Sequence, residues 1–171
     1  MNWETVLIEK YTTASARMIS KVHYSGYSAE QVFEIMGDPD RITDWYLLAH
    51  SVRKHPPSVE GEESFNVVFT FFGDVFEEIL EWSPPESYVY KASGPDFPIK
   101  DYVAQIEVLE TDEKTGTMIW TTYFDHIEGD AFQRILPVML PAVTEHSIIK
   151  LMTLIGGTSH EFTSDFTGIS V

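Results

Sequence analysis

Glu78 is the carboxyl group whose sequence neighbours best suit acid–base chemistry. It lies between Phe76 and Leu80 in an alternating run, so strand periodicity puts its side chain on the more apolar face. Burial there would raise its pKa toward neutrality, where a glutamate can act as a general acid or base. The alternative is a β-bulge that turns Glu78 outward beside Glu77 and Glu81, where it has no catalytic role.

Glu145 is the second candidate acid or base. It lies near the start of an apolar helical run in which Ile148 and Met152 belong to one broad inward arc. Thr144 and Glu145 fall on the same arc and interrupt its apolar pattern, which places polar groups toward the interior. Alternatively, Glu145 bends out to water and only favours the positive N-terminal end of the helix.

Aromatic side chains accompany these carboxyl groups along the chain. Tyr88, Tyr90 and Tyr102 supply phenol groups that could orient a ligand, although a buried tyrosine also packs while satisfying a backbone carbonyl. Trp45 suits two roles equally, a lid over a pocket mouth or a plug in the core. The predicted ligand-binding residues are Trp45, Phe69, Tyr88, Tyr90, Tyr102, Trp120, Thr144, Ile148 and Met152.

The composition is that of an acidic globular protein. Its 171 residues, 43% hydrophobic and 13% aromatic, suit one domain with a substantial core. With 11 Lys+Arg against 27 Asp+Glu the net charge is −16, which disfavours nucleic acids and anionic membrane surfaces as partners. The N-terminal segment carries Glu4 and no continuous apolar run, so we expect no membrane insertion and a cytoplasmic location.

Metal, cofactor and nucleophile chemistry have no support in the sequence. There is no cysteine, and the six histidines are scattered, with none at a helical ligand spacing. The sequence also lacks a P-loop, a dinucleotide-binding glycine motif, a nucleophile elbow and an H-E-x-x-H motif. We therefore expect neither a metal nor an organic cofactor.

The elements that must position these residues follow from periodicity and turn signals. A strand over residues 16–24 is followed by two short helices, over residues 28–36 and 40–49, and then by six strands between residues 51 and 126. A long helix over residues 130–157 comes last, broken or kinked between Arg134 and Pro141 because Pro137 and Pro141 interrupt it. We predict an α+β helix-grip fold, in which a curved seven-stranded antiparallel sheet, two short helices and the long helix enclose an apolar cavity.

The predicted domain boundaries leave a segment at each end. Residues 1–14 are an N-terminal extension, residues 15–157 the helix-grip domain, and residues 158–171 a polar, loosely held tail. The last predicted strand, residues 117–126, is apolar on both faces. The sequence therefore does not decide which of its two faces points inward. An apolar outer face would indicate a homodimer interface or cover by the N-terminal extension.

One stretch resembles a known family. The run SAEQVFEIMGDPDRITDWY, with Ser28-Ala29, Val32-Phe33, Asp38-Pro39 and Trp45 in place, resembles the start of the START-like (SRPBCC) superfamily, in particular its polyketide cyclase/dehydrase branch. The later runs ILEWSPPESYVYKASGP and GTMIW are similar to strands of that branch. The resemblance implies the helix-grip fold and a cavity that serves polyketide cyclisation, lipid or hormone binding, or carriage of a hydrophobic cofactor. Cyclases of the branch position a polyketide with a pocket arginine, and no arginine here is predicted to point inward.

Three functions follow as expectations. The first is binding of a hydrophobic, ring-containing small molecule, such as a lipid, quinone or polyketide-like compound, for transport, sequestration or presentation. The second is a cyclase or dehydratase (lyase) that uses Glu78 or Glu145 as general acid or base, and the third is an adaptor for a client protein. Leu136, Met139 and Leu140 are expected to form, with Trp45, an adjustable gate at the pocket mouth.

Overall fold

The computed structural model describes residues 8–56, 64–167 and 169. Its strands are β1 (Ala16–Ser25), β2 (Ala49–Lys54), β3 (Ser64–Phe69), β4 (Gly73–Ser83), β5 (Ser87–Ser93), β6 (Ile99–Lys100), β7 (Tyr102–Asp112), β8 (Thr115–Phe124), β9 (His126–Ile127) and β10 (Gly157–Asp165). Its helices are η1 (Ile8–Lys10), α1 (Ala29–Gly37), η2 (Pro39–Arg41), α2 (Ile42–Trp45) and α3 (Asp130–Ile155).

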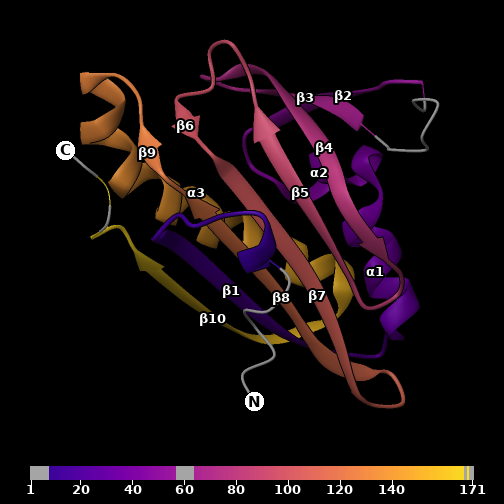
Figure 1. The fold of residues 1–171 in the computed structure, drawn as a ribbon. Helices are drawn as coiled ribbons and strands as arrows, with labels where there is room; N and C mark the ends of the chain where they lie inside the picture. The colour runs from indigo at the N-terminus through magenta and orange to yellow at the C-terminus, as the bar shows by residue number, and fades with distance from the viewer. Residues whose placement is uncertain (1–7, 57–63, 168, 170–171) are drawn as a thin grey trace.

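One antiparallel sheet of eight strands forms the body of the fold, in the order β10-β1-β8-β7-β5-β4-β3-β2. Helix α3 runs across one side of this sheet, and α1 and α2 lie on the same side at its other end (Figure 1). Strands β6 and β9 pair separately beside it. The predicted α+β helix-grip fold is confirmed, but the sheet has eight strands rather than seven.

The additional strand is β10, which lies within the stretch predicted to be a loosely held polar tail. Gly156, in the left-handed conformation at φ 70°, ends α3 and reverses the chain. The Ser25 N–H donates to the Gly156 carbonyl at 2.9 Å, and β10 then pairs antiparallel with β1 from Tyr24 to Arg17. The tail prediction is therefore wrong for residues 158–165, because polar residues suit an edge strand with one face in water.

Helix α1 begins where the sequence predicts. The Ser28 N–H donates to Gln31 Oε1 at 3.0 Å and the Gln31 N–H donates to Ser28 Oγ at 3.3 Å, so the predicted capping box is confirmed. The helix buries Val32, Phe33 and Met36 against the sheet. This contact closes one end of the space between the sheet and α3.

Helix α3 is continuous over 26 residues, so of the two alternatives predicted between Arg134 and Pro141, a break or a kink, the break is wrong. Pro137 and Pro141 lie one turn apart inside the helix, and each removes one backbone donor without interrupting the helical path. The predicted inward arc is confirmed, since Ile148, Leu151 and Ile155 are fully buried. By length and composition alone α3 is apolar enough to cross a membrane, and in this fold its apolar side packs on the sheet as a core helix.

Strand β8 turns Met118, Trp120 and Phe124 toward the helices. Its opposite face is covered in part by η1, because Ile8 is fully buried against Val89, Val103 and Tyr123. Cover by the N-terminal extension is thus seen at Ile8 and Ala14, whereas residues 1–7 lie outside the described residues.

Candidate functional site

An aromatic pocket lies between the concave face of the sheet and helices α1, α2 and α3. Its cavity volume is about 70 Å³. Side chains from β1, β3, β4, β5, β7 and β8 line it together with Leu140 and Thr144 of α3. Because the pocket lies between the sheet and the helices packed on one side of it, it follows from the helix-grip architecture itself.

Seven of the nine residues predicted to bind a ligand line this pocket. They are Trp45, Phe69, Tyr88, Tyr90, Tyr102, Trp120 and Thr144. Ile148 and Met152 do not line it, so their predicted placement is wrong. They lie one and two turns beyond Thr144 toward the end of α3, where Ile148 is fully buried in the core and Met152 packs against it.

Glu77 is the carboxyl group inside the pocket. The side chains of Val75, Glu77 and Ile79 line it from β4, and Glu77 is only 6% exposed. Among the described residues, its carboxyl group forms no hydrogen bond or ion pair, and its burial raises its pKa from 4.5 to about 8. A glutamate in this setting is protonated for most of the time at neutral pH, and it titrates within the physiological range.

Glu78 points out of the pocket, so its predicted inward placement is wrong. Its Oε2 atom lies 3.0 Å from Nζ of Lys91, the residue paired with it on β5. The register shifts between Ile79 and Glu81, so the alternation extrapolated from Phe76 to Trp82 does not hold, and Trp82 returns to the pocket side. The sequence signal was ambiguous because both alternating sets of β4 contain large apolar residues.

Glu145 also lies outside the pocket. Its side chain is 52% exposed, and its Oε1 atom is 3.6 Å from Nε2 of His160 on β10. Its neighbour Thr144 points inward instead, with Oγ1 at 3.8 Å from the sulfur of Met18. The alternative that Glu145 bends out to solvent is the one observed.

The pocket tyrosines have different roles. The Tyr88 hydroxyl donates to the Met36 carbonyl at 2.6 Å, so this phenol secures the end of α1. Tyr90 and Tyr102 share a side-chain hydrogen bond, and Tyr102 forms another with Thr122. Burial raises the pKa of Tyr102 to about 12, so these phenols remain protonated at physiological pH.

Three rings form the wall nearest α2. Trp45 packs edge-on against Trp120 with ring centroids 5.5 Å apart at 90°, and Tyr46 contacts Trp120 at 5.9 Å. Trp45 is 4% exposed, which fits the core plug better than a lid. Tyr46 and Glu77 line the pocket without having been predicted, although each directly neighbours a predicted residue. Phe97 was not predicted either, because it enters the pocket from a loop where periodicity gives no signal.

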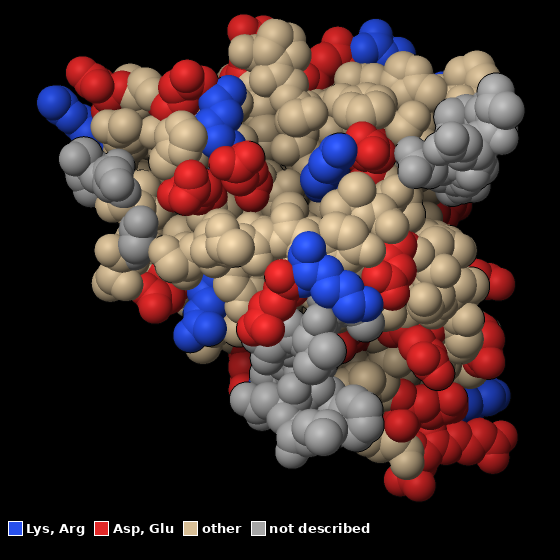
Figure 2. Space-filling model, in the orientation of Figure 1, with Lys and Arg blue, Asp and Glu red and all other residues tan. Residues whose placement is uncertain are grey.

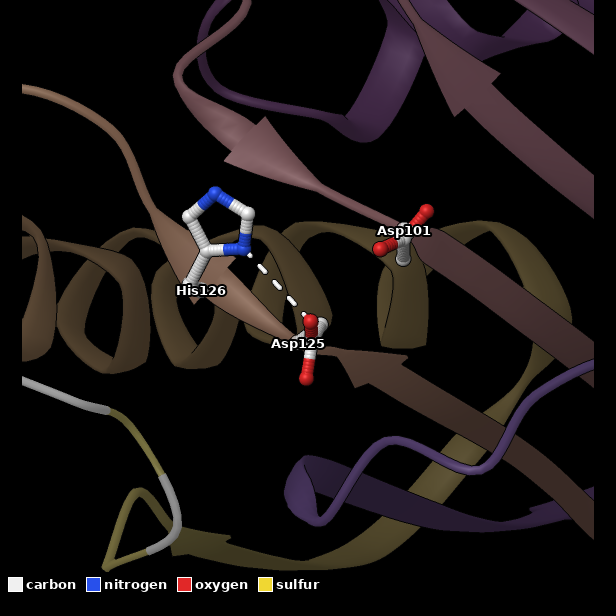
Figure 3. Close-up of side chains that lie close together, drawn as sticks. All are labelled: Asp101, Asp125 and His126. Atoms are coloured by element: carbon white, nitrogen blue, oxygen red, sulfur yellow. Dashed lines mark ion pairs between the residues drawn. The ribbon is translucent and has the colours of Figure 1, made fainter.

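A separate cluster lies at the surface. Asp101, Asp125 and His126 could offer a metal ion ligand atoms that all lie within 4.8 Å of one another, and Asp125 Oδ2 is 3.5 Å from His126 Nδ1 (Figure 3). None of the three lines the aromatic pocket.

Acidic side chains are also gathered over the end of the β7–β8 hairpin, where Glu110, Asp112 and Glu113 are exposed (Figure 2).

Comparisons with solved structures agree on the fold. An aromatase/cyclase from Streptomyces sp. R1128 is 14% identical with a TM-score of 0.64, over 82% of this chain and 92% of that one. A START superfamily protein from Mycobacterium smegmatis is 12% identical with a TM-score of 0.60, over 81% and 97%. An uncharacterised protein from Bacillus thuringiensis is 18% identical with a TM-score of 0.63, over 82% and 98%.

The family comparison covers most of the domain. No functionally curated protein matches the chain. The model of the family described as polyketide cyclase / dehydrase and lipid transport matches residues 19–151, from the middle of β1 to the last turns of α3. The predicted START-like resemblance is thereby confirmed, and the chain belongs to the polyketide cyclase/dehydrase and lipid transport family.

Proposed function

We propose that this protein binds a compact, ring-containing hydrophobic molecule in the aromatic pocket. The observation that supports this function is a cavity walled by aromatic side chains that contains one buried carboxyl group. Apolar walls with few polar groups are typical of sites that bind a small molecule by shape and fix its orientation at one point. Family and fold are consistent with hydrophobic ligand binding or cyclase-type chemistry.

The size of the pocket favours a compact ligand over a long-chain lipid. At about 70 Å³ the cavity is much smaller than the roughly 300 Å³ or more that is usual for ligand pockets. A single ring therefore requires side chains to move aside. Met18 and Met36 both line the pocket, and their flexible thioether side chains suit such adjustment.

Filling the cavity tests this function. Ala92 lines the pocket, and Ala142 is exposed on α3, so Ala92→Leu and Ala142→Leu add the same side chain inside and outside the site. Native mass spectrometry and thermal shift against neutral phenols, quinones and polyketide-like compounds should show binding to the wild type and to Ala142→Leu. Loss of binding only in Ala92→Leu is the expected result, and equal binding to all three proteins would exclude this pocket.

Glu77 supports a second function, acid–base catalysis by a cyclase or dehydratase. Its pKa of about 8 lets it accept or donate a proton near neutral pH, beside the hydroxyls of Tyr90 and Tyr102. No arginine, lysine or histidine of the described residues lines the pocket, so a substrate would have to be held by rings and phenols. If Glu77 is the general acid or base of such an enzyme, Glu77→Gln should lower kcat by roughly 10²- to 10⁴-fold. Glu78→Gln should leave kcat unchanged, because Glu78 points out of the pocket.

A further inference from the structure

We propose that the ligand of the aromatic pocket is an organic cation, a ring-bearing molecule with a protonated amine or quaternary ammonium group. This inference rests on the proposed binding function and adds the chemical class of the ligand. It follows from three independent features of the site: the sign of its charged groups, an unpartnered carboxyl group and the arrangement of its rings.

The charged side chains that line the pocket are both acids. Glu77 lies inside it and Asp38 borders it, and no basic side chain of the described residues lines it. Asp38 contributes to an exposed ion pair with Lys54 at 3.8 Å, whereas Glu77 has no such partner. A cation that binds beside Glu77 would favour its ionised form, and the net charge of −16 attracts cations to the molecule as a whole.

Glu77 lacks a partner among the residues that the structure describes. It is 94% buried, it forms no hydrogen bond or ion pair with the described residues, and the groups that face it are the phenols of Tyr46, Tyr88, Tyr90 and Tyr102. Burying a carboxyl group without a partner costs stability, because water solvates it better than an apolar wall does. A cationic ligand would supply the missing partner at the centre of the site.

The rings offer the second element of cation recognition. Trp45 and Trp120 lie at 90° to each other, and Tyr46 lies at 72° to Trp120 and 82° to Phe69. These rings pack edge-to-face on one another and all of them line the pocket, so a ligand there meets several aromatic surfaces at once, as a quaternary ammonium ligand does in an aromatic cage. The indole and phenol faces attract a cation through their quadrupoles, most strongly where water is excluded.

Other ligand classes fit these features less well. A carboxylate, phosphate or phenolate would find no basic side chain of the described residues in the pocket to pair with, and its charge would oppose ionisation of Glu77. A neutral apolar ring would fill the cavity but leave the carboxyl group without an ionic partner. A ring that carries an ammonium group satisfies both the apolar walls and Glu77.

A pair of isosteric probes separates charge from shape. Phenyltrimethylammonium and tert-butylbenzene have the same outline and differ by one positive charge, so their dissociation constants at pH 8.5 isolate the contribution of the charge. We expect the cation to bind roughly tenfold more tightly or better. Equal or tighter binding of tert-butylbenzene would overturn the inference and leave the proposed hydrophobic binding intact. Failure of the cation to bind would overturn it as well, and the Ala92→Leu comparison then decides the binding function separately.

The pH dependence of phenyltrimethylammonium binding assigns the effect to Glu77, because the probe itself does not titrate. Its affinity should rise with pH from pH 6, by at most about tenfold per unit, and level off above the Glu77 pKa of about 8. Glu77→Gln should abolish this rise, and the neighbouring Glu78→Gln, which alters only an outward ion pair, should retain it. Affinity that does not change with pH in the wild type would overturn the inference without any variant.

Discussion

Glu77 and Glu78 are adjacent on β4 and lie on opposite faces of the sheet, the first in the aromatic pocket and the second in an ion pair with Lys91. The pleat of the strand alone gives these two identical side chains different properties. Glu77 is desolvated and has a raised pKa, whereas Glu78 is paired and partly solvated. The pair is therefore a built-in comparison in which the same substitution tests burial at one position and controls for it at the other.

Stability should depend on pH through Glu77. Its pKa rises from 4.5 to about 8 on folding, so the folded state keeps a proton that the unfolded state releases between these values. Relative to Glu77→Gln, the wild type should lose stability as the pH rises from about 4.5 to 8, by on the order of 4 kcal/mol in total. Urea unfolding of both proteins from pH 4.5 to pH 9 measures the difference.

The same series with Glu78→Gln provides the control. Because this carboxyl group is 25% exposed and pairs with Lys91, its substitution should change stability by less than about 1 kcal/mol without the same pH trend. If wild type and Glu77→Gln differ by the same amount at pH 4.5 and pH 9, Glu77 is ionised in the folded protein and the assigned environment is wrong.

The turn after α3 should be intolerant of a side chain. A Cβ at Gly156 would clash with the Ser25 carbonyl oxygen and with the ring of Tyr27, and φ is 70°. Gly26 also has a positive φ, 90°, but a Cβ there would meet nothing within 4 Å. We expect Gly26→Ala to cost about 1 kcal/mol and Gly156→Ala roughly 2 to 4 kcal/mol in thermal or urea unfolding. Equal costs would mean that backbone conformation alone makes Gly156 necessary.

Tyr88 should matter for the fold rather than for the ligand. Its hydroxyl is occupied by the Met36 carbonyl at the end of α1, so Tyr88→Phe leaves that carbonyl without its buried donor. We expect a loss of about 1 to 2 kcal/mol in unfolding free energy and ligand affinity within about twofold of wild type. A large loss of affinity with unchanged stability would show instead that this hydroxyl reaches the ligand.

The sequence was sufficient for the fold wherever a local signal and the apolar pattern agreed. The capping box at Ser28 and the inward arc through Ile148 and Leu151 both appear as predicted. The apolar pattern failed on β4, where a shift of one residue in the alternation decides which side chains point into the pocket. On β4 both alternating sets are apolar and a bulge follows Ile79, so the chain pattern could not distinguish Glu77 from Glu78.

The remaining errors come from tertiary context. A polar edge strand resembles a tail in sequence, because nothing local shows that β1 offers residues 157–165 a pairing edge. The prolines of α3 suggested a break, but packing keeps the helix continuous through Pro137 and Pro141. Aromatic residues were a good guide to the pocket, since all six predicted aromatic positions line it.

The prolines should still make the first half of α3 open more easily. Pro137 and Pro141 provide no N–H for the carbonyls one turn earlier, and Ile135 and Val138 are 54% and 75% exposed. We predict faster amide hydrogen exchange in residues 134–141 than in residues 145–155, with slowing when a ligand contacts Leu140 in the pocket. Equal exchange in the two segments would show that the prolines shape a rigid helix rather than an adjustable gate.

The most direct test of the site is the titration of Glu77 itself, observed by ¹³C NMR of glutamate side-chain carboxyl groups. The Glu77 signal is identified by its absence in Glu77→Gln and should titrate with a pKa of about 8 in the free protein. Saturation with phenyltrimethylammonium should lower that pKa, because a bound cation favours the carboxylate. A Glu77 signal that titrates near 4.5, the ordinary value, and does not move with ligand would contradict a buried carboxyl group at the centre of a binding pocket.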